Sequence, residues 1–400
     1  MQYRFFAPTS AGFAVNTRIL HVLDHLQPSA ALSRLLMLAR RLPGSADHGH
    51  RFTVVSLQRI NGRPECVESA KRMAAAGIQV ETVSQAAGWD PLAPVRLRRL
   101  VSRLQPELIH IWQPAGLAWA RMAAAGRPLI ASIDNWPGRY DRWQLSLMRS
   151  SIRHVDAVVV PNELVAAQVR KYLAARDEQL TIIAPGVEPP AASQSSGASR
   201  EALFAAAQLP ADARVIAAVG RLVPCRRVRD AIWNIDILSL LFLNSYLVIL
   251  GDGPQKRRLQ AFNRALRGWA HTRFVSWQNP ADWWPHVELV FHFDDEPGIS
   301  QSLLEAMAAG KPVIASDTAS HRAFLEDGVH THFAALNDRT SLAKCGRRLL
   351  LDPAAAAAIG AAGQARVLER FGADAFVEAH RQLYDSLAAG ARASLAIRSA

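Results

Sequence analysis

DDEPGISQSLLEAMAAGKPVIASD, residues 294–317, predicts the fold of this chain. A short apolar run before it, 289–291, is typical of a buried strand, and Pro297 and Gly298 favour a loop at its start. Apolar residues then recur at helical spacing as far as Gly310, and a second apolar run follows directly. The stretch therefore predicts a strand, a loop, a helix and a second parallel strand.

Such a unit offers a binding site for a nucleotide. Its helix begins beside the carboxyl end of a parallel sheet, where the first backbone N–H groups suit a phosphate. Glu305 lies about one turn into this helix. A carboxylate at that point can accept hydrogen bonds from both vicinal hydroxyls of a ribose. We therefore interpret the stretch as a nucleotide site in an α/β domain.

The part of the stretch from 302 to 315 resembles the nucleotide-sugar signature of the retaining glycosyltransferases of family 4, the glycosyl transferases group 1. The resemblance implies an α/β protein of the GT-B fold, with two doubly wound Rossmann-like domains facing a central cleft. It implies that Glu305 holds the ribose of the donor, and that backbone amides near Ser302 and Leu303 bind phosphate beside Gly298. The alternative interpretation is an ordinary helix–strand turn with a surface glutamate. It explains the periodicity of the apolar residues but not the full match to the signature over 302–315.

Residues 219–227 resemble the paired basic motif of the same family. Arg221 matches its first basic residue, Arg226 replaces the usual lysine, and Arg227 replaces a glycine. The resemblance assigns Arg221 and Arg226 to the diphosphate, whose negative charge grows as the anomeric bond breaks. The alternative is a basic loop on a basic protein.

Two glycines complete the expected donor site. Gly220 precedes the basic motif, and Gly253 lies in the segment 250–254, which resembles the family's turn beside the nucleotide. In isolation that segment indicates only a turn, so its weight comes from its spacing to the other two motifs.

Other positions depart from the family pattern. The family pairs Glu305 with a glutamate eight positions earlier, where this chain has Pro297. Glu296 is the expected substitute, and altered sugar recognition is the alternative. Asp134 stands where the family usually has a histidine that contacts the donor sugar. An ionised aspartate can accept a hydrogen bond from a sugar hydroxyl, so Asp134 joins Arg221 and Arg226 as a candidate catalytic residue.

The first half of the chain predicts a second doubly wound α/β domain, because apolar runs alternate with helical segments. The order resembles the acceptor-side domain of the family. His110 and Trp112, at the end of the fourth run, are expected to pack there or to line the acceptor side. The expected strands are 18–23, 53–57, 78–83, 108–112, 128–133, 157–160 and 180–183.

The domain boundaries follow from these runs and from one linker. The linker, 189–204, is rich in proline and serine. The predicted organisation is an acceptor-side domain at 1–188, the linker, a nucleotide-sugar domain at 205–375, a helix at 376–390 that crosses back in the resembled fold, and a tail at 391–400. The expected strands of the second domain are 214–220, 246–250, 273–275, 289–291 and 313–315.

Composition limits the partners and cofactors. The net charge is +12, but the excess arginines are scattered through helices rather than interleaved with aromatic residues, so we expect no nucleic acid partner. Cys66, Cys225 and Cys345 show no zinc or disulfide spacing, which fits a reducing cytoplasm. We therefore expect no metal and no other cofactor.

Contact with a membrane remains a hypothesis. No signal peptide is expected at residues 1–13, and the apolar stretch 231–250 is interrupted by polar residues, which indicates a buried helix and strand. A helix near 97–104 has an apolar face and carries arginines on the opposite face. Such a helix could lie on a membrane, although it more often covers a sheet. We expect a cytoplasmic protein, with peripheral contact at an anionic inner membrane face as the hypothesis.

The combined interpretation is a hexosyltransferase-type glycosyltransferase that retains anomeric configuration. Its donor would be a UDP-, GDP- or ADP-sugar, and its acceptor a glycan, a lipid or another cell-envelope molecule. The alternative is a catalytically degenerate GT-B protein that binds nucleotide or sugar as a scaffold partner, which the departures at Pro297 and Asp134 favour. A sugar-nucleotide epimerase is a third interpretation, but it lacks a visible acid/base pair.

Overall fold

The computed structural model describes residues 17–399 except 43–49, 59, 61–63, 84–91, 114–115, 136–139, 191–196 and 277–278. The middle of the predicted linker and the segment considered for a signal peptide lie outside the described residues. The chain forms two compact units, one made of Met1–Gly186 with Ala373–Ala400 and the other of Val187–Gly372.

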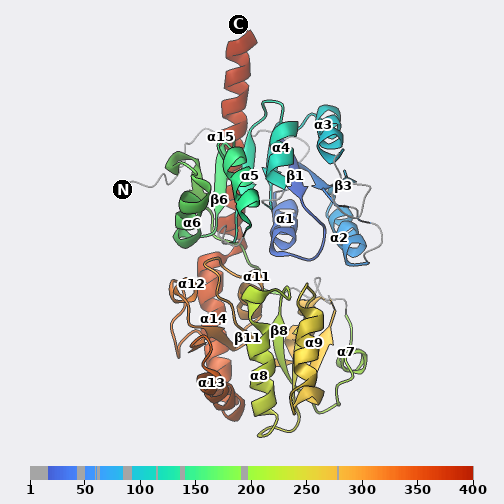
Figure 1. Cartoon of the computed structure of the whole chain (residues 1–400), viewed down its shortest axis with the longest axis vertical. Helices are drawn as coiled ribbons and strands as arrows, with labels where there is room; N and C mark the ends of the chain where they lie inside the picture. The colour runs from blue at the N-terminus through green and yellow to red at the C-terminus, as the bar shows by residue number, and fades with distance from the viewer. Residues whose placement is uncertain are drawn as a thin grey trace. The chain divides into compact units, whose positions relative to one another are not determined.

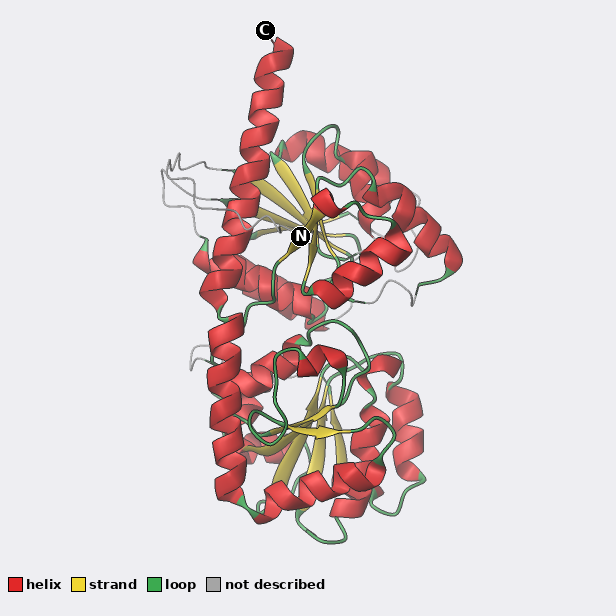
Figure 2. Ribbon diagram, turned by 90° about the vertical axis from the view of Figure 1, so that its left-hand side faces the viewer, coloured by secondary structure: helices red, strands yellow, loops and turns green. Residues whose placement is uncertain are grey.

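The first unit contains a parallel seven-stranded sheet in the order β3-β2-β1-β4-β5-β6-β7, with helices on both faces (Figures 1 and 2). All seven strands predicted for this half are confirmed. The strands are β1 (Arg18–Leu23), β2 (Arg51–Ser56), β3 (Gln79–Thr82), β4 (Leu108–Ile111), β5 (Leu129–Ser132), β6 (Ala157–Val160) and β7 (Leu180–Ile182). The helices are α1 (Ala30–Arg41), α2 (Pro64–Ala75), α3 (Ala93–Leu104), α4 (Leu117–Ala123), α5 (Arg142–Ile152), α6 (Glu163–Leu173) and α15 (Ala373–Ser399).

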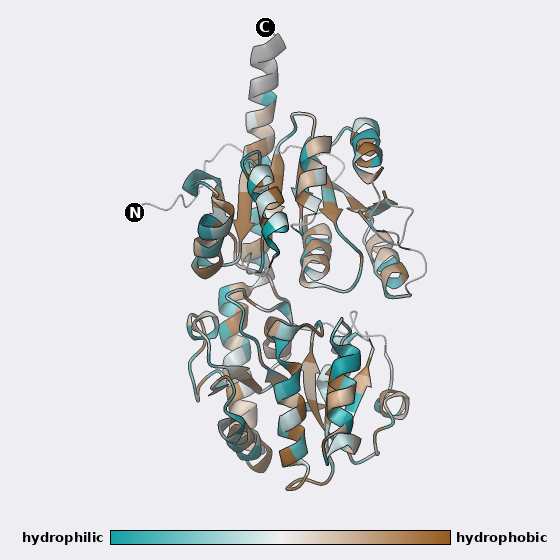
Figure 3. Cartoon of the chain, in the orientation of Figure 1, coloured by the Kyte–Doolittle hydropathy of each residue, from teal (hydrophilic) through white to brown (hydrophobic). Residues whose placement is uncertain are grey.

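Alternate residues of β1 enter two different cores. Leu20 and Val22 pack on one face of the sheet, whereas Ile19 and Leu23 pack on the other. A strand that is buried on both faces needs a continuous apolar run, and this is the pattern that predicts it. Figure 3 shows the result as strands that are mostly brown.

Helix α15 contributes to the second of these cores. Phe376, Val377, Leu383 and Tyr384 are buried there together with residues of β1 and α1. The preceding helix, α14 (Pro353–Phe371), ends before Gly372, and α15 begins after it. The last helix of the chain is thus part of the first unit.

Helix α3 covers the sheet of the first unit. Leu97, Leu100 and Val101 are buried in the core, while Arg99 and Arg103 are exposed. The sheet-covering interpretation of this amphipathic helix is therefore confirmed. Among the described residues, no helix has the length and the apolar character needed to cross a membrane.

The second unit has a parallel six-stranded sheet in the order β10-β9-β8-β11-β12-β13. Five of these strands were predicted, and β13 was missed because its three residues form too short an apolar run. The strands are β8 (Arg214–Val219), β9 (Ser245–Leu250), β10 (Thr272–Val275), β11 (Val287–His292), β12 (Val313–Ser316) and β13 (His332–Ala334). The other helices are α7 (Arg200–Ala206), α8 (Val228–Leu238), α9 (Lys256–Arg264), α10 (Pro280–Trp283), α11 (Gln301–Ala308), α12 (Ala319–Arg322) and α13 (Arg339–Leu351).

The strand order of this unit reverses between β8 and β11, which are neighbours in the sheet although β9 and β10 separate them in sequence. Loops that leave the two strands at such a switch point diverge, and ligands of open α/β sheets bind there. The segments 219–227 and 293–300, which carry the predicted donor residues, follow these two strands.

Candidate functional site

The loops after β8 and β9 approach each other closely at the carboxyl edge of the second sheet. A Cβ atom on Gly251 would lie 1.9 Å from the carbonyl oxygen of Gly220, and one on Gly253 would lie 2.5 Å from that of Leu222. The two loops are also joined by backbone hydrogen bonds, of which one runs from Leu222 N–H to the carbonyl of Asp252. Glycine is therefore required at 251 and 253 for the loops to meet.

Helix α11 begins beside this pair of loops. Gly220 has φ 138°, and a Cβ atom there would lie 3.4 Å from the Oγ of Ser302 in the first turn of α11. The Ser302 hydroxyl lies 3.1 Å from that of Ser300, the N-cap residue. Backbone N–H groups of a first helical turn have no partner within the helix, so this end suits an anion. The predicted residues Gly220 and Ser302 are thus brought together.

Two other predicted residues of α11 differ in exposure. Leu303 is fully buried in the core, so its side chain supports the helix and only its backbone can serve a ligand. Glu305 lies further along the helix and is partly exposed, as a ribose-binding carboxylate must be.

Arg226 faces the loop that follows β11. Its Nη1 lies 2.8 Å from Oδ2 of Asp294, and its Nη2 lies 3.7 Å from Oε2 of Glu296. The backbone joins the same two loops, since Asp295 N–H donates to the carbonyl of Cys225. Both carboxylates are buried while the guanidinium is partly exposed. Arg226 and Glu296, predicted separately, form one charged cluster, and Pro297 and Gly298 continue the loop from it.

The other two arginines of the motif have different surroundings. Arg221 is exposed. Arg227 has φ 44°, a left-handed conformation that glycine adopts without strain, which explains the glycine of the family pattern at this position. Its guanidinium is paired with Asp230 and bonded to Asn337.

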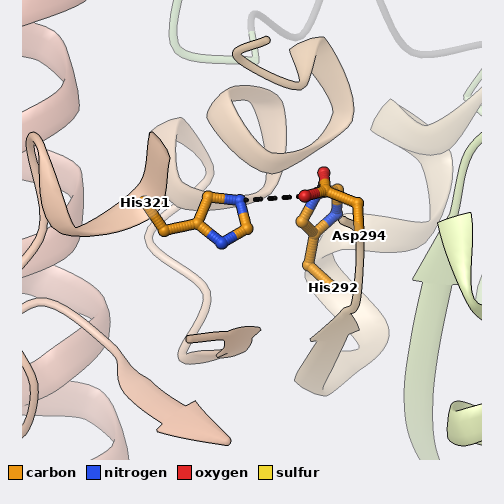
Figure 4. Close-up of side chains that lie close together, drawn as sticks. All are labelled: His292, Asp294 and His321. Carbon is orange, nitrogen blue, oxygen red and sulfur yellow. Dashed lines mark hydrogen bonds and ion pairs between the residues drawn. The ribbon is translucent and has the colours of Figure 1, made fainter. Parts of the chain in front are cut away.

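Asp294 lies at the centre of a buried cluster shown in Figure 4. Nε2 of His292 lies 2.9 Å from its Oδ2, and Nε2 of His321 lies 3.5 Å from its Oδ1. Burial alone would raise the pKa of Asp294, but the hydrogen bond from His292 and the charges of His321, His292 and Arg226 hold that pKa below its ordinary value. Burial lowers the pKa of His292.

The same three residues are the group among the described residues whose donor atoms, all within 4.8 Å, suit a metal ion by type. Their hydrogen bonds argue against that use. His292 and Arg226 both donate to Oδ2 of Asp294, and Nδ1 of His321 donates to the carbonyl of Ser316. Only two acceptor atoms remain, whereas a structural zinc ion takes four ligands. The donor set does not fit a metal ion.

In the first unit, Asp134 follows β5 and forms an ion pair with Arg34 of α1, at 2.6 Å between Oδ1 and Nη1. The arginine side chain is 4% exposed and the aspartate side chain 23%. A guanidinium so deeply buried depends on this carboxylate for its charge compensation. The contact of Asp134 with a sugar stays a prediction.

His110 and Trp112 lie inside the first unit. The rings of His110 and Trp112 stack with centroids 4.4 Å apart, and neither side chain reaches the surface. His110 is bonded to the hydroxyl groups of Tyr384 and Ser132, and Trp112 donates to His21. The structure thus assigns them to packing, and contact with an acceptor stays a prediction.

The model of Glycosyltransferase Family 4 matches residues 33–190, and that of Glycosyl transferases group 1 matches residues 199–366. Together they span both units. The chain belongs to the family 4, or group 1, glycosyltransferases.

Two relatives from Rhizobium meliloti are lipopolysaccharide core biosynthesis glycosyltransferases. LpsD is 28% identical over 72% of this chain and 78% of its own length, and LpsE is 23% identical over 74% and 80%. Among solved structures, HepE of Anabaena in complex with UDP-glucose has a TM-score of 0.74 at 19% identity, covering 92% of this chain and all of its own. The two parallel-sheet units of this glycosyltransferase constitute the GT-B fold.

Several residues around the site of this glycosyltransferase were not predicted. His321 is far in sequence from His292 and Asp294, and the parallel pairing of β11 with β12 brings it to them. The position of Asp294 two residues after a buried strand is the signal that could have found it. In the first unit, Asp24 directly follows β1 and gives the same signal. Burial raises the pKa of Asp24 to about 7.

Proposed function

We propose that this glycosyltransferase moves a hexose from a nucleoside diphosphate sugar to a glycan, lipid or other cell-envelope acceptor, with retention of anomeric configuration. The family supports the transfer reaction, the lipopolysaccharide-core relatives support the acceptor class, and the UDP-glucose complex of HepE supports the donor class. The observation that carries the donor assignment is the meeting of the Gly220 loop with the first turn of α11.

In this proposal each motif residue binds one part of the donor. The first-turn N–H groups of α11 at Ser302 and Leu303, beside Gly220, donate hydrogen bonds to the diphosphate, and Glu305 accepts hydrogen bonds from the ribose hydroxyls. Arg226, held by two carboxylates, presents its remaining N–H groups in one fixed orientation to the phosphate oxygens. Exposed Arg221 adds charge that steers the anionic donor.

The departing diphosphate gains negative charge as the anomeric bond breaks. Preorganised donors stabilise that charge without reorganising, so the Arg226 guanidinium contributes more to the transition state than to the ground state. Glu296, buried beside Arg226 and next to Pro297, is proposed to accept a hydroxyl of the transferred sugar in place of the family's first glutamate. The carboxylate of Asp134 is proposed to accept a hydrogen bond from another hydroxyl of the same sugar.

A contact with anionic membrane at the cytoplasmic face is proposed for the start of α3. Leu92 and Val95 are 56% and 49% exposed there, and Arg98 and Arg99 are exposed beside them. Apolar and basic side chains together favour the interface of an anionic bilayer. Sedimentation with phosphatidylglycerol vesicles should exceed sedimentation with phosphatidylcholine vesicles, and Arg98→Glu should abolish the difference. Equal sedimentation with both would refute the contact.

The test of the function is release of nucleoside diphosphate from UDP-, GDP- and ADP-hexoses in the presence of a lipopolysaccharide-core acceptor. One donor should be consumed, the product linkage should keep the donor's anomeric configuration, and Glu305→Ala should abolish the release. A protein that binds a nucleotide but transfers to no acceptor or water would instead support a scaffold role.

A further inference from the structure

Two buried acceptor atoms face each other in the cluster around Asp294. Oδ1 of Asp294 and Nε2 of His321 lie 3.5 Å apart, and neither atom has a hydrogen-bond partner. Both side chains are at most 1% exposed. Such a pair of unsatisfied atoms is costly unless a proton lies between them.

The other ring nitrogen of His321 decides where that proton is needed. Nδ1 lies 2.7 Å from the carbonyl oxygen of Ser316, which can only accept, so Nδ1 carries a hydrogen. In a neutral ring, Nε2 would then direct its lone pair at the carboxylate oxygen of Asp294. Figure 4 shows the His321 ring facing the carboxylate of Asp294. A second hydrogen on Nε2 converts the repulsion into a charge-assisted hydrogen bond.

The charge balance of the cluster supports the same conclusion. Arg226 supplies one positive charge, whereas Asp294 and Glu296 supply two negative charges. His292 donates one hydrogen to Asp294 and burial favours its neutral form, so it does not correct the imbalance. Counted over these side chains alone, an imidazolium at 321 gives a net charge of zero.

The remaining charged neighbours of His321 do not replace this role. Asp317, at the end of β12, is paired with Arg322 of the same helix as His321, so their charges offset each other. From α14, Arg366 donates to the carbonyl of Phe324, whose ring lies beside His321.

We propose that His321 is a positioning residue, an imidazolium that fixes the carboxylate of Asp294 and, through it, the guanidinium of Arg226. The effect of His321 on catalysis rests on the proposed function. Loss of the proton from His321 leaves Asp294 facing a lone pair, and the loop that carries Asp294 and Glu296 then relaxes away from α12. Nucleoside diphosphate binding therefore weakens when this proton is lost. Comparison with a variant separates that effect from the ionisation of the phosphates themselves.

The protonation state is tested first, without any ligand. Long-range proton–nitrogen NMR spectra of the full-length protein labelled with 15N-histidine, assigned with His321→Gln, should show hydrogens on both ring nitrogens of His321 at neutral pH. A ring with hydrogen on Nδ1 alone would overturn the proposal, as would stoichiometric zinc in the purified protein that a chelator removes with a change in the His321 resonances. This measurement holds whether or not the protein transfers sugar.

The positioning role is tested by calorimetric titration with UDP, GDP and ADP between about pH 6 and about pH 9, using the nucleotide that binds wild type most tightly. His321→Gln keeps a hydrogen-bond donor but loses the charge, so binding should weaken about tenfold at the acid end and its dependence on pH should flatten. The exposed His154→Gln should match wild type. A variant that is less stable but keeps the wild-type pH profile would overturn the positioning role. Absence of nucleotide binding by wild type would overturn the proposed function while the NMR result still stands.

Discussion

Arg226 and Asp294 form an ion pair, 2.8 Å between Nη1 and Oδ2, that joins the loops following two neighbouring strands of the second sheet. The aspartate side chain is 1% exposed and the arginine side chain 20%. A charge pair in such surroundings fixes a geometry more than it adds stability, but removal of one partner leaves the other uncompensated. The pair therefore links the stability of the unit to the orientation of the arginine that we propose to bind the donor.

Replacement of Arg226 should affect both stability and binding. Arg226→Met leaves the buried carboxylate of Asp294 without its cation, so the free energy of unfolding should fall by about 3 kcal/mol. Arg221→Met, at an exposed position of the same motif, should change it by no more than about 0.5 kcal/mol. Urea unfolding of both variants measures the contrast, and equal losses would contradict the ion-pair account. Both variants should bind nucleotide more weakly.

The glycine of the β9 loop should tolerate no side chain. A Cβ atom at 251 would lie 1.9 Å from the carbonyl oxygen of Gly220, so Gly251→Ala should destabilise the protein by about 2 kcal/mol or more and displace the Gly220 loop. Gly390→Ala is the matched control, because nothing lies within 4 Å of a Cβ there and α15 gains about 1 kcal/mol of helix propensity. Thermal unfolding and nucleotide titration of both variants check this. Wild-type nucleotide affinity in Gly251→Ala would contradict the proposed role of the loop.

The glycosyltransferase should lose stability in mild acid through its first unit. Burial lowers the pKa of His21 from 6.5 to about 3 and that of His380 from 6.5 to about 4. The unfolded chain therefore binds more protons than the folded chain below about pH 6.5, and stability falls as pH decreases from there. At about pH 4, protonation of the unfolded chain at each of these histidines lowers the free energy of unfolding by about 3 kcal/mol. Urea unfolding across this pH range tests the prediction. His380→Phe should reduce the slope of the free energy of unfolding against pH, and an unchanged slope would contradict the prediction.

Asp24 should act in the opposite direction. Its pKa is raised by burial from 3.8 to about 7, so its neutral form stabilises the fold at low pH, and this stability is lost as pH rises through about 7. Asp24→Asn should therefore raise the free energy of unfolding at about pH 8, by up to about 4 kcal/mol, and have little effect at about pH 4. The exposed Asp212→Asn provides the control. Equal effects of Asp24→Asn at both pH values would show that the carboxyl ionises freely.

The strands could be predicted because parallel strands covered by helices need continuous apolar runs, as at 157–160 and 313–315. β13 could not, since its three residues differ little from a loop. The motifs that contain Arg221, Arg226 and Glu305 could be assigned by their resemblance to the family pattern, and the contact of these residues with a donor stays a prediction. The charged partners of Arg226 could not be predicted. Arg226, Asp294 and His321 follow three different strands, and they meet only when those strands pair in the sheet.

The burial of His110 and Trp112 has a similar cause. Their position at the end of β4 is compatible with a surface site, but α15 lies far away in sequence and covers them through Tyr384 and His380. A contact across such a separation depends on the return of the chain to the first unit, which no local pattern encodes.

The most direct test of the donor site is calorimetric titration of wild type, Glu305→Ala and the exposed Glu178→Ala with UDP-, GDP- and ADP-glucose. A helix-borne carboxylate that accepts two ribose hydroxyls contributes enough for its loss to weaken binding about tenfold or more. We predict that one sugar nucleotide binds wild type and Glu178→Ala equally and binds Glu305→Ala at least tenfold more weakly. Equal affinity of all three proteins for that nucleotide would contradict the assignment of the donor site to α11.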